Sequence, residues 1–412
     1  MTKPQKKVLK EIRNDFASNQ QMIRLLQGDV GSGKTVVALL SILISIDNNY
    51  QSCLVAPTEI LAFQHFKNFK DKFENLGLVV KVLTGSTKSS DRKILLNDLK
   101  NGSINLLIGT HAIFEQNVIF NNLGYAVIDE QHRFGVKQRS KIWEKNNPPP
   151  HVLIMTATPI PRTLTMSLYG DLDLSIIDEL PPGRKDVITV HRKDKNRLKV
   201  FGFIRDQIKQ GRQIYIVYPL IEESKKMDLK YLEDGLESIT REFDKENYSI
   251  GVMHGRMRSS NKDIEMNNFL NGKIDILIST TVIEVGVNVP NASVMIIENA
   301  ERFGLSQLHQ LRGRVGRGKY DSYCVLMTND KISEDAKIRI DAMVNSNDGF
   351  KISEVDLRLR GPGDVLGTKQ SGVLDFKIAD IIEDESILFS VSNEADLLIK
   401  KDPKLNLNEN YN

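Results

Sequence analysis

Short apolar runs alternate with amphipathic stretches along most of the chain. Each run has the length of a strand, is rich in Val and Ile, and mostly does not alternate in polarity. Runs of this kind are typical of strands buried on both faces, as in a parallel sheet covered by helices. The runs are Met22–Gln27, Cys53–Ala56, Asn105–Thr110, Tyr125–Asp129 and Val152–Thr156 in the first half, and Ile214–Tyr218, Ile250–Met253, Ile274–Thr280, Val294–Glu298 and Tyr323–Met327 in the second. The repeated alternation predicts an α/β protein with two doubly wound domains.

Breaks in this pattern divide the chain into three segments. The run Pro181–Arg184 (PPGR) cannot continue a helix or a central strand, and we place a domain boundary there. After Met327 the strand pattern stops, and helices are predicted over Lys331–Val344 and Ser353–Arg360, with Ser353 as the N-cap of the second. The predicted domains are residues 1–183, 184–330 and 331–412, the last being a helical hairpin appendage with a C-terminal tail.

The composition fits a globular protein of two or three domains. The chain has 412 residues, of which 40% are hydrophobic and 26% are charged, and a disordered chain would be less apolar. The longest apolar stretch, Val36–Ile46, is too short to span a bilayer, and the N-terminus shows no signal peptide. Cys53 and Cys324 lie in apolar runs and are predicted to be buried thiols. We therefore expect a cytoplasmic protein without membrane contact, and the net charge of +3 is only weak evidence for a polyanionic partner.

A glycine-rich segment supplies the first candidate chemistry. Residues Gly28–Thr35 (GDVGSGKT) match G-x-x-x-x-G-K-[ST] in full, follow a predicted strand and open an apolar helix, as a P-loop does. The alternative is a Gly-rich turn without function, but motif and context together favour the P-loop. Lys34 would reach the β- and γ-phosphates of ATP, and Thr35 would bind Mg²⁺. The predicted ATP-binding residues of the loop are Gly28, Asp29, Val30, Gly31, Ser32, Gly33, Lys34 and Thr35.

Acidic and basic clusters elsewhere extend this chemistry. Asp129 and Glu130 follow an apolar strand, and ligands of α/β sheets bind at the carboxyl ends of such strands. Beside a P-loop we expect Asp129 to hold Mg²⁺ and Glu130 to deprotonate the attacking water; the alternative is a solvated acidic turn. Residues Gln310–Arg317 (QLRGRVGR) follow a second sheet that has no P-loop of its own. They could form a basic surface turn, or they could supply arginines to the nucleotide of the first domain.

Together these segments resemble the motifs of superfamily 2 helicases, which implies two RecA-like P-loop NTPase domains in tandem. Thr2–Gln5 is similar to the glutamine motif that reads adenine, so Gln5 joins the ATP-binding residues by resemblance. Gln310–Arg317 is similar to motif VI, in which Arg314 and Arg317 would be arginine fingers. The catalytic residues that the resemblance implies are Lys34, Glu130, Arg314 and Arg317.

The same resemblance implies residues that grip one DNA strand or couple it to the nucleotide. The segments Ala56–Glu59, Gly109–His111, Thr156–Thr158 and Ser279–Val287 look like motifs Ia, Ib, III and V. The residues that these segments contribute are Thr58, Thr110, His111, Thr156, Thr158 and Thr280.

Longer matches resemble one family within the superfamily, the RecG family of bacterial fork-reversing helicases. They are Asp129–Gly135 (DEQHRFG), Met155–Leu164 (MTATPIPRTL), Pro181–Arg184, Met253–Met257 (MHGRM) and Glu298–Gly318. In addition, Ser346–Gly372 is similar to the translocation motif of that family, in which Arg358, Arg360 and Gln370 fall at matching positions.

The resemblance implies an ATP- and Mg²⁺-dependent helicase that translocates on double-stranded DNA. Its expected substrates are branched DNA, through replication fork reversal and Holliday junction branch migration in DNA repair and recombination. We expect a monomer in the bacterial cytoplasm. The family also carries an N-terminal wedge domain, whereas this sequence begins at the glutamine motif. The expectation is therefore a motor portion that lacks the wedge.

Two alternative functions stay open at this point. The motor of a transcription-repair coupling factor shares the translocation motif, although that family lacks the DEQHRFG form. An ATP-gated DNA-binding clamp that turns over poorly would keep the same nucleotide motifs without being a motor. DNA-stimulated ATP hydrolysis distinguishes the clamp from both motors.

Overall fold

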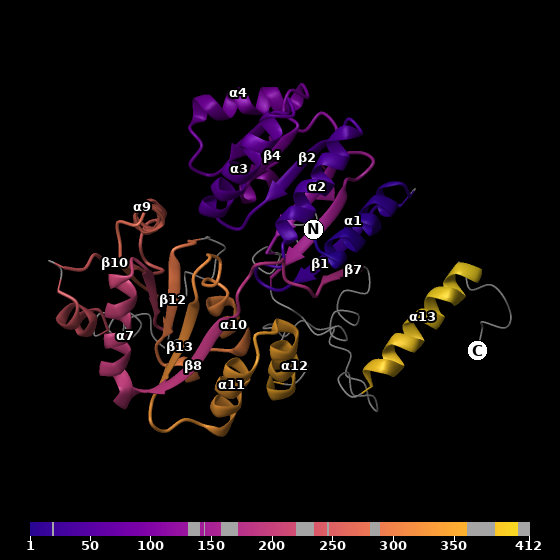
Figure 1. Ribbon diagram of the computed structural model, residues 1–412. Coiled ribbons are helices and arrows are strands. Elements are labelled where there is room, and N and C mark those ends of the chain that lie inside the picture. The colour runs from indigo at the N-terminus through magenta and orange to yellow at the C-terminus, as the bar shows by residue number, and fades with distance from the viewer. Residues whose placement is uncertain are drawn as a thin grey trace.

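The chain folds into two sheets of parallel strands that follow one another along the sequence (Figure 1). The computed structural model describes residues 1–18, 20–130, 141–143, 145–157, 172–219, 235–244, 247–280, 289–360 and 384–402. All strand pairs in both sheets are parallel, and the strand order in each sheet is non-sequential. This arrangement confirms the predicted α/β class with two parallel-sheet domains in tandem.

The first sheet has seven strands in the order β3-β4-β2-β5-β6-β1-β7. Its strands are β1 (Ile23–Gly28), β2 (Gln51–Val55), β3 (Val80–Leu83), β4 (Leu106–Gly109), β5 (Leu123–Asp129), β6 (His151–Thr156) and β7 (Asp173–Ile177). In the centre, Leu26 of β1 pairs with Met155 of β6, and Asp129 of β5 pairs with the same Met155. The ends of β1, β6 and β5 therefore lie next to one another at the carboxyl edge of the sheet.

The second sheet has six strands in the order β10-β11-β9-β12-β13-β8. Its strands are β8 (Val187–Lys193), β9 (Gln213–Val217), β10 (Ile250–Met253), β11 (Ile276–Ser279), β12 (Ala292–Ile297) and β13 (Ser322–Thr328). The first sheet ends with Ile177 and the second begins with Val187, so the PPGR run connects them.

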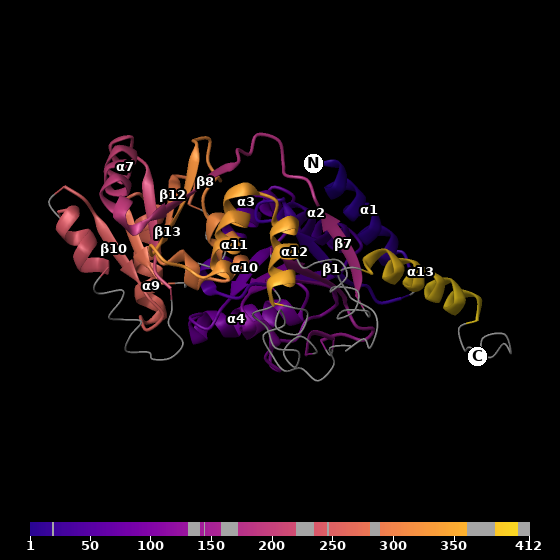
Figure 2. The same ribbon diagram turned by 90° about the horizontal axis from the view of Figure 1, so that it is seen from below.

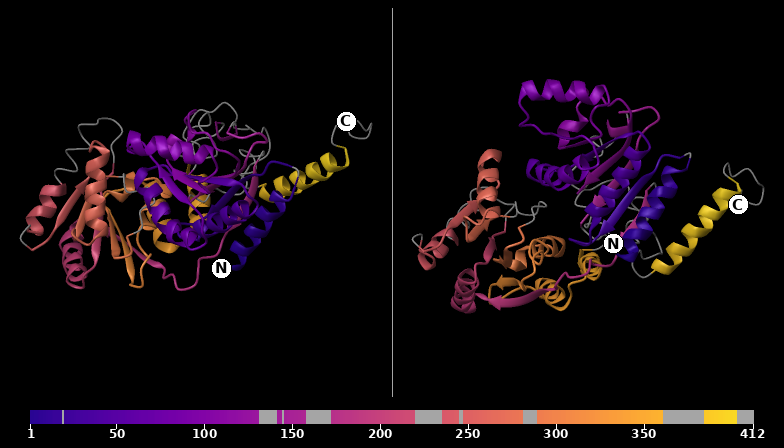
Figure 3. Two further views of the ribbon diagram at one scale, coloured as in Figure 1. Left: turned by 90° about the horizontal axis from the view of Figure 1, so that it is seen from above. Right: turned by 45° about the horizontal axis from the view of Figure 1, so that its top comes forward.

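Helices cover both sheets, and two of them lie on the side of the second sheet that faces the first (Figures 1 and 2). The helices of the first half are α1 (Lys3–Phe16), α2 (Lys34–Asp47), α3 (Glu59–Glu74), α4 (Ser89–Lys100) and the 3-10 turn η1 (His111–Phe114). Those of the second half are η3 (Asp194–Asn196), α7 (Arg197–Lys209), α9 (Ser259–Leu270), η5 (Ala300–Arg302), α10 (Leu305–Arg312), α11 (Glu334–Asn345), α12 (Gly349–Arg360) and α13 (Glu385–Lys401). The facing helices are α10 and α12, while α13 projects on the side of α1 (Figure 3).

Apolar side chains pack on both faces of each sheet, as the non-alternating runs predicted. The neighbours Leu25 and Leu26 on β1 are both fully buried but belong to clusters on opposite faces. Cys53 and Cys324 are buried free thiols, which confirms that prediction. Within the described residues, every helix is too short or too polar to span a bilayer.

Three strands were not predicted, and all three are edge strands. β3, β7 and β8 each pair on one side only, and in each of them few residues are buried while the others are half-buried or exposed. An edge strand contributes fewer apolar residues to the core, so its sequence lacks the continuous apolar run of a central strand.

The C-terminal helices differ in detail from the prediction. Ser333 caps α11, and α12 begins at Gly349 rather than at Ser353. Ser353 is not an N-cap, because its hydroxyl donates to Phe350 O inside the helix at 2.7 Å. α11 and α12 pack against each other, while the predicted loop of the translocation motif at residues 361–372 lies outside the described residues. The hairpin as a translocation device stays a prediction.

Candidate nucleotide site

The predicted P-loop connects the carboxyl end of β1 to the first turn of α2. Gly33 caps α2 with φ +88°, a conformation that residues with a side chain rarely adopt. Gln5 supports the loop, because its Nε2 donates to Ser32 O at 2.8 Å. Thr2 and Gln5 form a capping box at the start of α1, with Thr2 N donating to Gln5 Oε1 at 2.9 Å. Recognition of adenine by Gln5 stays a prediction, whereas the contact of Gln5 with the P-loop is observed in the structure.

Lys34 lies inside the curve of the loop. Its Nζ donates to the carbonyl oxygens of Gly28 at 2.7 Å and Asp29 at 3.0 Å. Burial lowers the pKa of Lys34, while the carboxylates of Glu130 and Asp129 counteract this effect. Phosphate oxygens make stronger, charge-assisted hydrogen bonds than these carbonyls, so Lys34 can exchange one set of acceptors for the other.

The acid pair follows β5 at the same edge of the sheet. Asp129 is the last residue of the strand, and Glu130 has φ 52°, in the left-handed region. Non-glycine residues are uncommon there, and such strain gathers at functional sites. Glu130 Oε2 accepts a hydrogen bond from Ala157 N at 3.3 Å. Burial raises the pKa of Glu130 and the charge of Asp129 raises it further, which makes this carboxylate a stronger base than a free glutamate.

Residues from both halves line one cavity of about 460 Å³. The first half contributes Val30, Gly31, Gly33, Lys34, Thr35, Leu61, Gln64, His65, Asp129, Glu130 and Ala157; the connection contributes Pro181, Pro182, Gly183 and Arg184; and the second half contributes Arg314, Gly316, Arg317 and Gly318. The predicted catalytic residues Lys34, Glu130, Arg314 and Arg317 therefore all face the same space, although their chemical roles stay predictions.

Three guanidinium groups and one ammonium group converge on this cavity. Arg184 donates to Val30 O of the P-loop, and Arg317 Nε donates to Gly313 O at 3.0 Å. Burial lowers the pKa of Arg317 to about 9, and the like charges of Arg314 and Arg184 add to the effect. Because each positive charge disfavours the others, the cluster is stabilised by a polyanion such as a triphosphate.

The donor set of the cavity suits ATP with Mg²⁺. Thr35 and Asp129 both line it and offer a hydroxyl and a carboxylate oxygen. Mg²⁺ prefers oxygen ligands and usually combines one or two protein groups with phosphate oxygens and water. No cluster of three or more His, Cys, Asp or Glu that could hold a metal is found in the part of the chain that the structure describes. A Mg²⁺ ion held by Thr35 and Asp129 would take its other ligands from phosphate oxygens and water.

The two halves also repeat one local structure near the predicted DNA residues. Thr110 follows β4 and its N–H donates to Leu83 O at 3.3 Å, while Thr280 follows β11 and its N–H donates to Met253 O at 3.2 Å. Both threonine hydroxyls are buried, and neither has a hydrogen-bond partner among the described residues. The strand ends therefore offer equivalent polar positions in both domains.

The other predicted DNA residues have mixed positions. Thr58 caps α3 by accepting from Leu61 N at 3.4 Å, and Thr156 ends β6. His111 and Arg358 are exposed. Thr158, Gln370 and the side chain of Arg360 lie outside the described residues, so their roles stay predictions.

Sequence reasoning missed three residues that contact the site. His65 on α3 places its Nε2 3.0 Å from Asp129 Oδ2. Arg184 was predicted only as part of the Pro181–Arg184 segment, and His309, which contacts Asp29 from outside the cavity, only as part of the Glu298–Gly318 match. Helical periodicity around His65 and the charge of Arg184 gave no indication of their partners, because those partners lie 64 and 154 residues away.

Comparisons with protein families agree with this geometry. Residues 2–167 match the DEAD/DEAH box helicase family, and residues 196–319 match the helicase conserved C-terminal domain. Residues 346–411 match the C-terminal part of domain 3 of the ATP-dependent DNA helicase RecG.

Individual relatives and solved structures match most of the chain. The chain is 51% identical over 405 residues to the ATP-dependent DNA helicase RecG of Synechocystis sp., covering 98% of this chain and 48% of the relative. It is 48% identical over 402 residues to the RecG of Bacillus subtilis, covering 98% and 58%. A structure of RecG bound to a three-way DNA junction matches with a TM-score of 0.79 and 44% identity, covering 94% of this chain and 50% of that one. The chain thus spans about half the length of the curated relatives that it matches.

Proposed function

The chain belongs to the RecG family of ATP-dependent DNA helicases, and we propose that it is an ATP-driven motor that moves on double-stranded DNA and remodels branched DNA. The observation that carries the proposal is the shared cavity, in which Arg314 and Arg317 face Lys34 and Glu130. A nucleotide between these residues would hold the two halves together. The RecG structure on a three-way junction supports branched DNA as the substrate.

In the proposed reaction, the residues of the first half bind ATP and activate water. Lys34 binds the β- and γ-phosphates in place of the P-loop carbonyls. Thr35 and Asp129 would hold Mg²⁺, which neutralises charge on the phosphates. Glu130 accepts a proton from the attacking water, and its raised pKa makes it more basic.

The residues of the second half act on the transferred phosphoryl group. Negative charge on its oxygens is stabilised by the planar donor groups of Arg314 and Arg317. Because these arginines come from the other half, hydrolysis requires a closed cavity and is coupled to movement between the halves. Hydrolysis and release of phosphate then allow the halves to separate again.

The proposed DNA contacts are mainly to the backbone. Thr58, Thr110, Thr156 and Thr280 lie at the carboxyl ends of strands in both sheets; the half-buried Thr58 can contact a phosphate directly, while the buried hydroxyls of Thr110 and Thr280 would reach one only after the strand ends rearrange. We therefore expect little sequence preference and a strong dependence of DNA affinity on salt. The bacterial relatives support action on DNA in the bacterial cytoplasm, and fork reversal and branch migration are the proposed reactions.

DNA-stimulated ATP hydrolysis tests the proposal directly. Phosphate release is measured with the wild type and Glu130→Gln, with and without duplex DNA. We expect DNA to stimulate the wild type and the variant to lose about 10² to 10⁴-fold in turnover. A wild type that DNA fails to stimulate would contradict a motor and indicate a clamp.

A second assay separates movement from binding. A triplex-forming strand is annealed to linear duplex DNA, and its displacement is followed after ATP addition. A translocating motor strips the third strand, whereas an ATP-gated clamp leaves it in place.

A further inference from the structure

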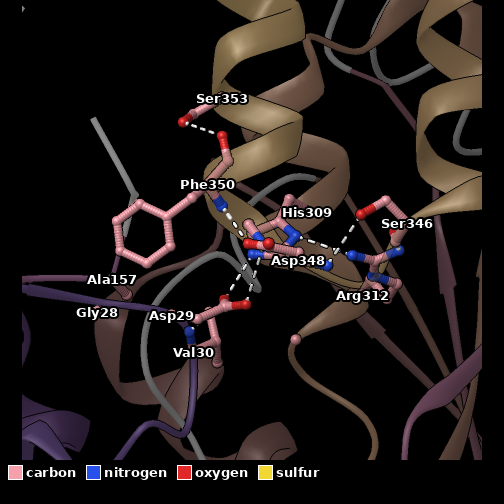
Figure 4. Close-up of polar contacts among 12 residues, drawn as sticks. Gly28, Asp29, Val30, Ala157, His309, Arg312, Ser346, Asp348, Phe350 and Ser353 are labelled. Atoms are coloured by element: carbon pink, nitrogen blue, oxygen red, sulfur yellow. Dashed lines mark hydrogen bonds and ion pairs between the residues drawn. The ribbon is translucent and has the colours of Figure 1, made fainter. Parts of the chain in front are cut away.

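Asp29 connects the P-loop to two helices of the second half (Figure 4). Its Oδ1 accepts from His309 Nε2 at 2.6 Å and from Val30 N at 2.5 Å. Its Oδ2 accepts from Gly349 N, the first residue of α12, at 3.3 Å. A carboxylate at the N-terminus of a helix is favoured by the helix dipole. The second residue of the P-loop therefore contacts α10 and α12 at once.

The neighbours of His309 determine which of its ring nitrogens carries the proton. Nδ1 lies 3.0 Å from Arg312 Nη2, and a guanidinium group can only donate. Nδ1 is therefore the acceptor, so Nε2 carries the proton and donates to Asp29. Both ring nitrogens of His309 are therefore used in hydrogen bonds.

Arg312 continues the connection to the pair α11 and α12. Its Nη1 donates to Met343 O in the last turn of α11 at 2.9 Å. The same nitrogen donates to Ser346 O, just beyond that helix, at 2.7 Å (Figure 4). His309 and Arg312 are 5% and 3% exposed, so water cannot easily replace these hydrogen bonds. A second contact, from Ser306 Oγ to Asp356 Oδ2 at 2.9 Å, ties α10 to α12.

The carboxylate of Asp29 is held in its charged form. Burial opposes ionisation, but the hydrogen bond from His309 outweighs it, with help from Val30 N and the charge of Lys34, and the pKa of Asp29 lies below its ordinary value. The backbone carbonyl of the same residue accepts from Lys34 Nζ at 3.0 Å. Asp29 thus contacts the phosphate-binding lysine through its backbone and the second half through its side chain.

We propose that Asp29, His309 and Arg312 form a relay that transmits nucleotide binding at the P-loop to helices α11 and α12, with His309 as its positioning residue. The inference rests on the proposed function, since it assumes that Lys34 leaves the Asp29 carbonyl to bind phosphate. Among the described residues, the Asp29 carbonyl then keeps only the hydrogen bond from Ser32 N at 3.1 Å, so the Asp29 peptide can shift about this remaining contact. The carboxylate then moves relative to His309 and Gly349, and the helices follow.

Two substitutions of His309 separate the two ends of the relay. In His309→Gln the side-chain amide reaches the position of Nε2 and can still donate to Asp29. In His309→Asn the shorter amide reaches the position of Nδ1, faces Arg312 and leaves Asp29 without its donor. His151→Asn is the control, since His151 begins β6 at the amino end of the first sheet, away from the P-loop edge, where its Nδ1 accepts from Met22 N at 3.0 Å.

Hydrogen exchange of the amides in residues 333–360, with and without a non-hydrolysable ATP analogue, tests the relay without DNA. We expect the analogue to change exchange in the wild type, in His309→Gln and in the control by about tenfold at the start of α12, and to have little effect in His309→Asn. An unchanged response in His309→Asn, or no response in the wild type, would overturn the relay.

Activity measurements distinguish a failure of the relay from a failure of the proposed function. Basal ATP hydrolysis should stay within about threefold in His309→Asn, while triplex displacement per ATP should fall about tenfold, and His309→Gln should recover most of it. Equal loss of both activities in the two variants would indicate a purely structural role for His309. If DNA fails to stimulate the wild type but the exchange response is present, the relay stands and the motor does not.

Discussion

His65 Nε2 lies 3.0 Å from Asp129 Oδ2, and both side chains are buried beside the nucleotide cavity. The imidazole therefore fixes the orientation of the carboxylate that is expected to hold Mg²⁺. Groups that orient a metal ligand matter for metal affinity even though they never touch the metal.

We expect His65→Ala to raise the Mg²⁺ concentration needed for half-maximal ATP hydrolysis by about 10- to 100-fold. Turnover at saturating Mg²⁺ should change much less, because the catalytic groups remain in place. A Mg²⁺ titration of the wild type and the variant measures this. An identical titration curve in both proteins would show that Asp129 needs no partner.

The rate of ATP hydrolysis should fall on the acidic side at a higher pH than a free glutamate would cause. Glu130 must be ionised to accept a proton, and its pKa is raised by burial and by Asp129. As the pH falls through this raised value, the base becomes protonated and kcat/KM declines. The decline is measured in the pH profile of kcat/KM. A decline centred on the ordinary pKa of glutamate would argue against Glu130 as the base.

Arg317→Gln should stabilise the nucleotide-free protein while abolishing hydrolysis. The folded state lowers the pKa of Arg317 to about 9, so at neutral pH the protonated group opposes folding. Removing its charge relieves this repulsion and raises Tm by roughly 2–4 °C for each kcal/mol gained.

The sign of the effect can be checked with pH. Above about pH 9 the folded wild type binds fewer protons than the unfolded chain, so its stability rises relative to the variant. The difference in Tm between Arg317→Gln and wild type should therefore shrink as the pH rises through this value. Arg192→Gln, a change at an exposed residue of β8, is the matched control.

Arg184→Ala should weaken ATP binding without changing DNA affinity. The guanidinium group donates to Val30 O and lines the cavity, so its loss removes a charged hydrogen bond and is expected to raise KM for ATP about tenfold. Arg184→Lys should recover little, because an ammonium group lacks the planar arrangement of donors.

Lys185→Ala serves as the control for Arg184. Lys185 is exposed and pairs with Asp321 at 2.7 Å on the surface, where ion pairs contribute little. A similar rise in KM for both variants would mean that the connection tolerates no substitution, rather than that Arg184 has a specific role.

The predictable part of this protein is the part that local sequence determines. Central strands such as β5 and β12 bury both faces and therefore show continuous apolar runs. The P-loop is equally local, since eight consecutive residues carry it. Edge strands share these features less, and β3, β7 and β8 went unpredicted for that reason.

The unpredicted part of the site consists of contacts between distant segments. His309 and Asp29 are 280 residues apart, and Gly349 and Asp29 are 320 apart. No periodicity or motif spacing reports such pairs, because they depend on how the second sheet is placed against the first. The resemblance to helicases predicted Arg314 and Arg317 at the site, but it did not predict the contacts of Asp29 with the second half.

The close approach of the two halves also limits how domains can be exchanged between related proteins. A Cβ atom added at Gly313, beside Arg312 and Arg314, would lie 2.8 Å from Cβ of Val30 in the P-loop. Positions 30 and 313 therefore share one volume, although they belong to different domains. A chimera that joins the first half of one relative to the second half of another must match these two positions to each other, and recombination between the halves is tolerated only among partners whose side chains there are compatible.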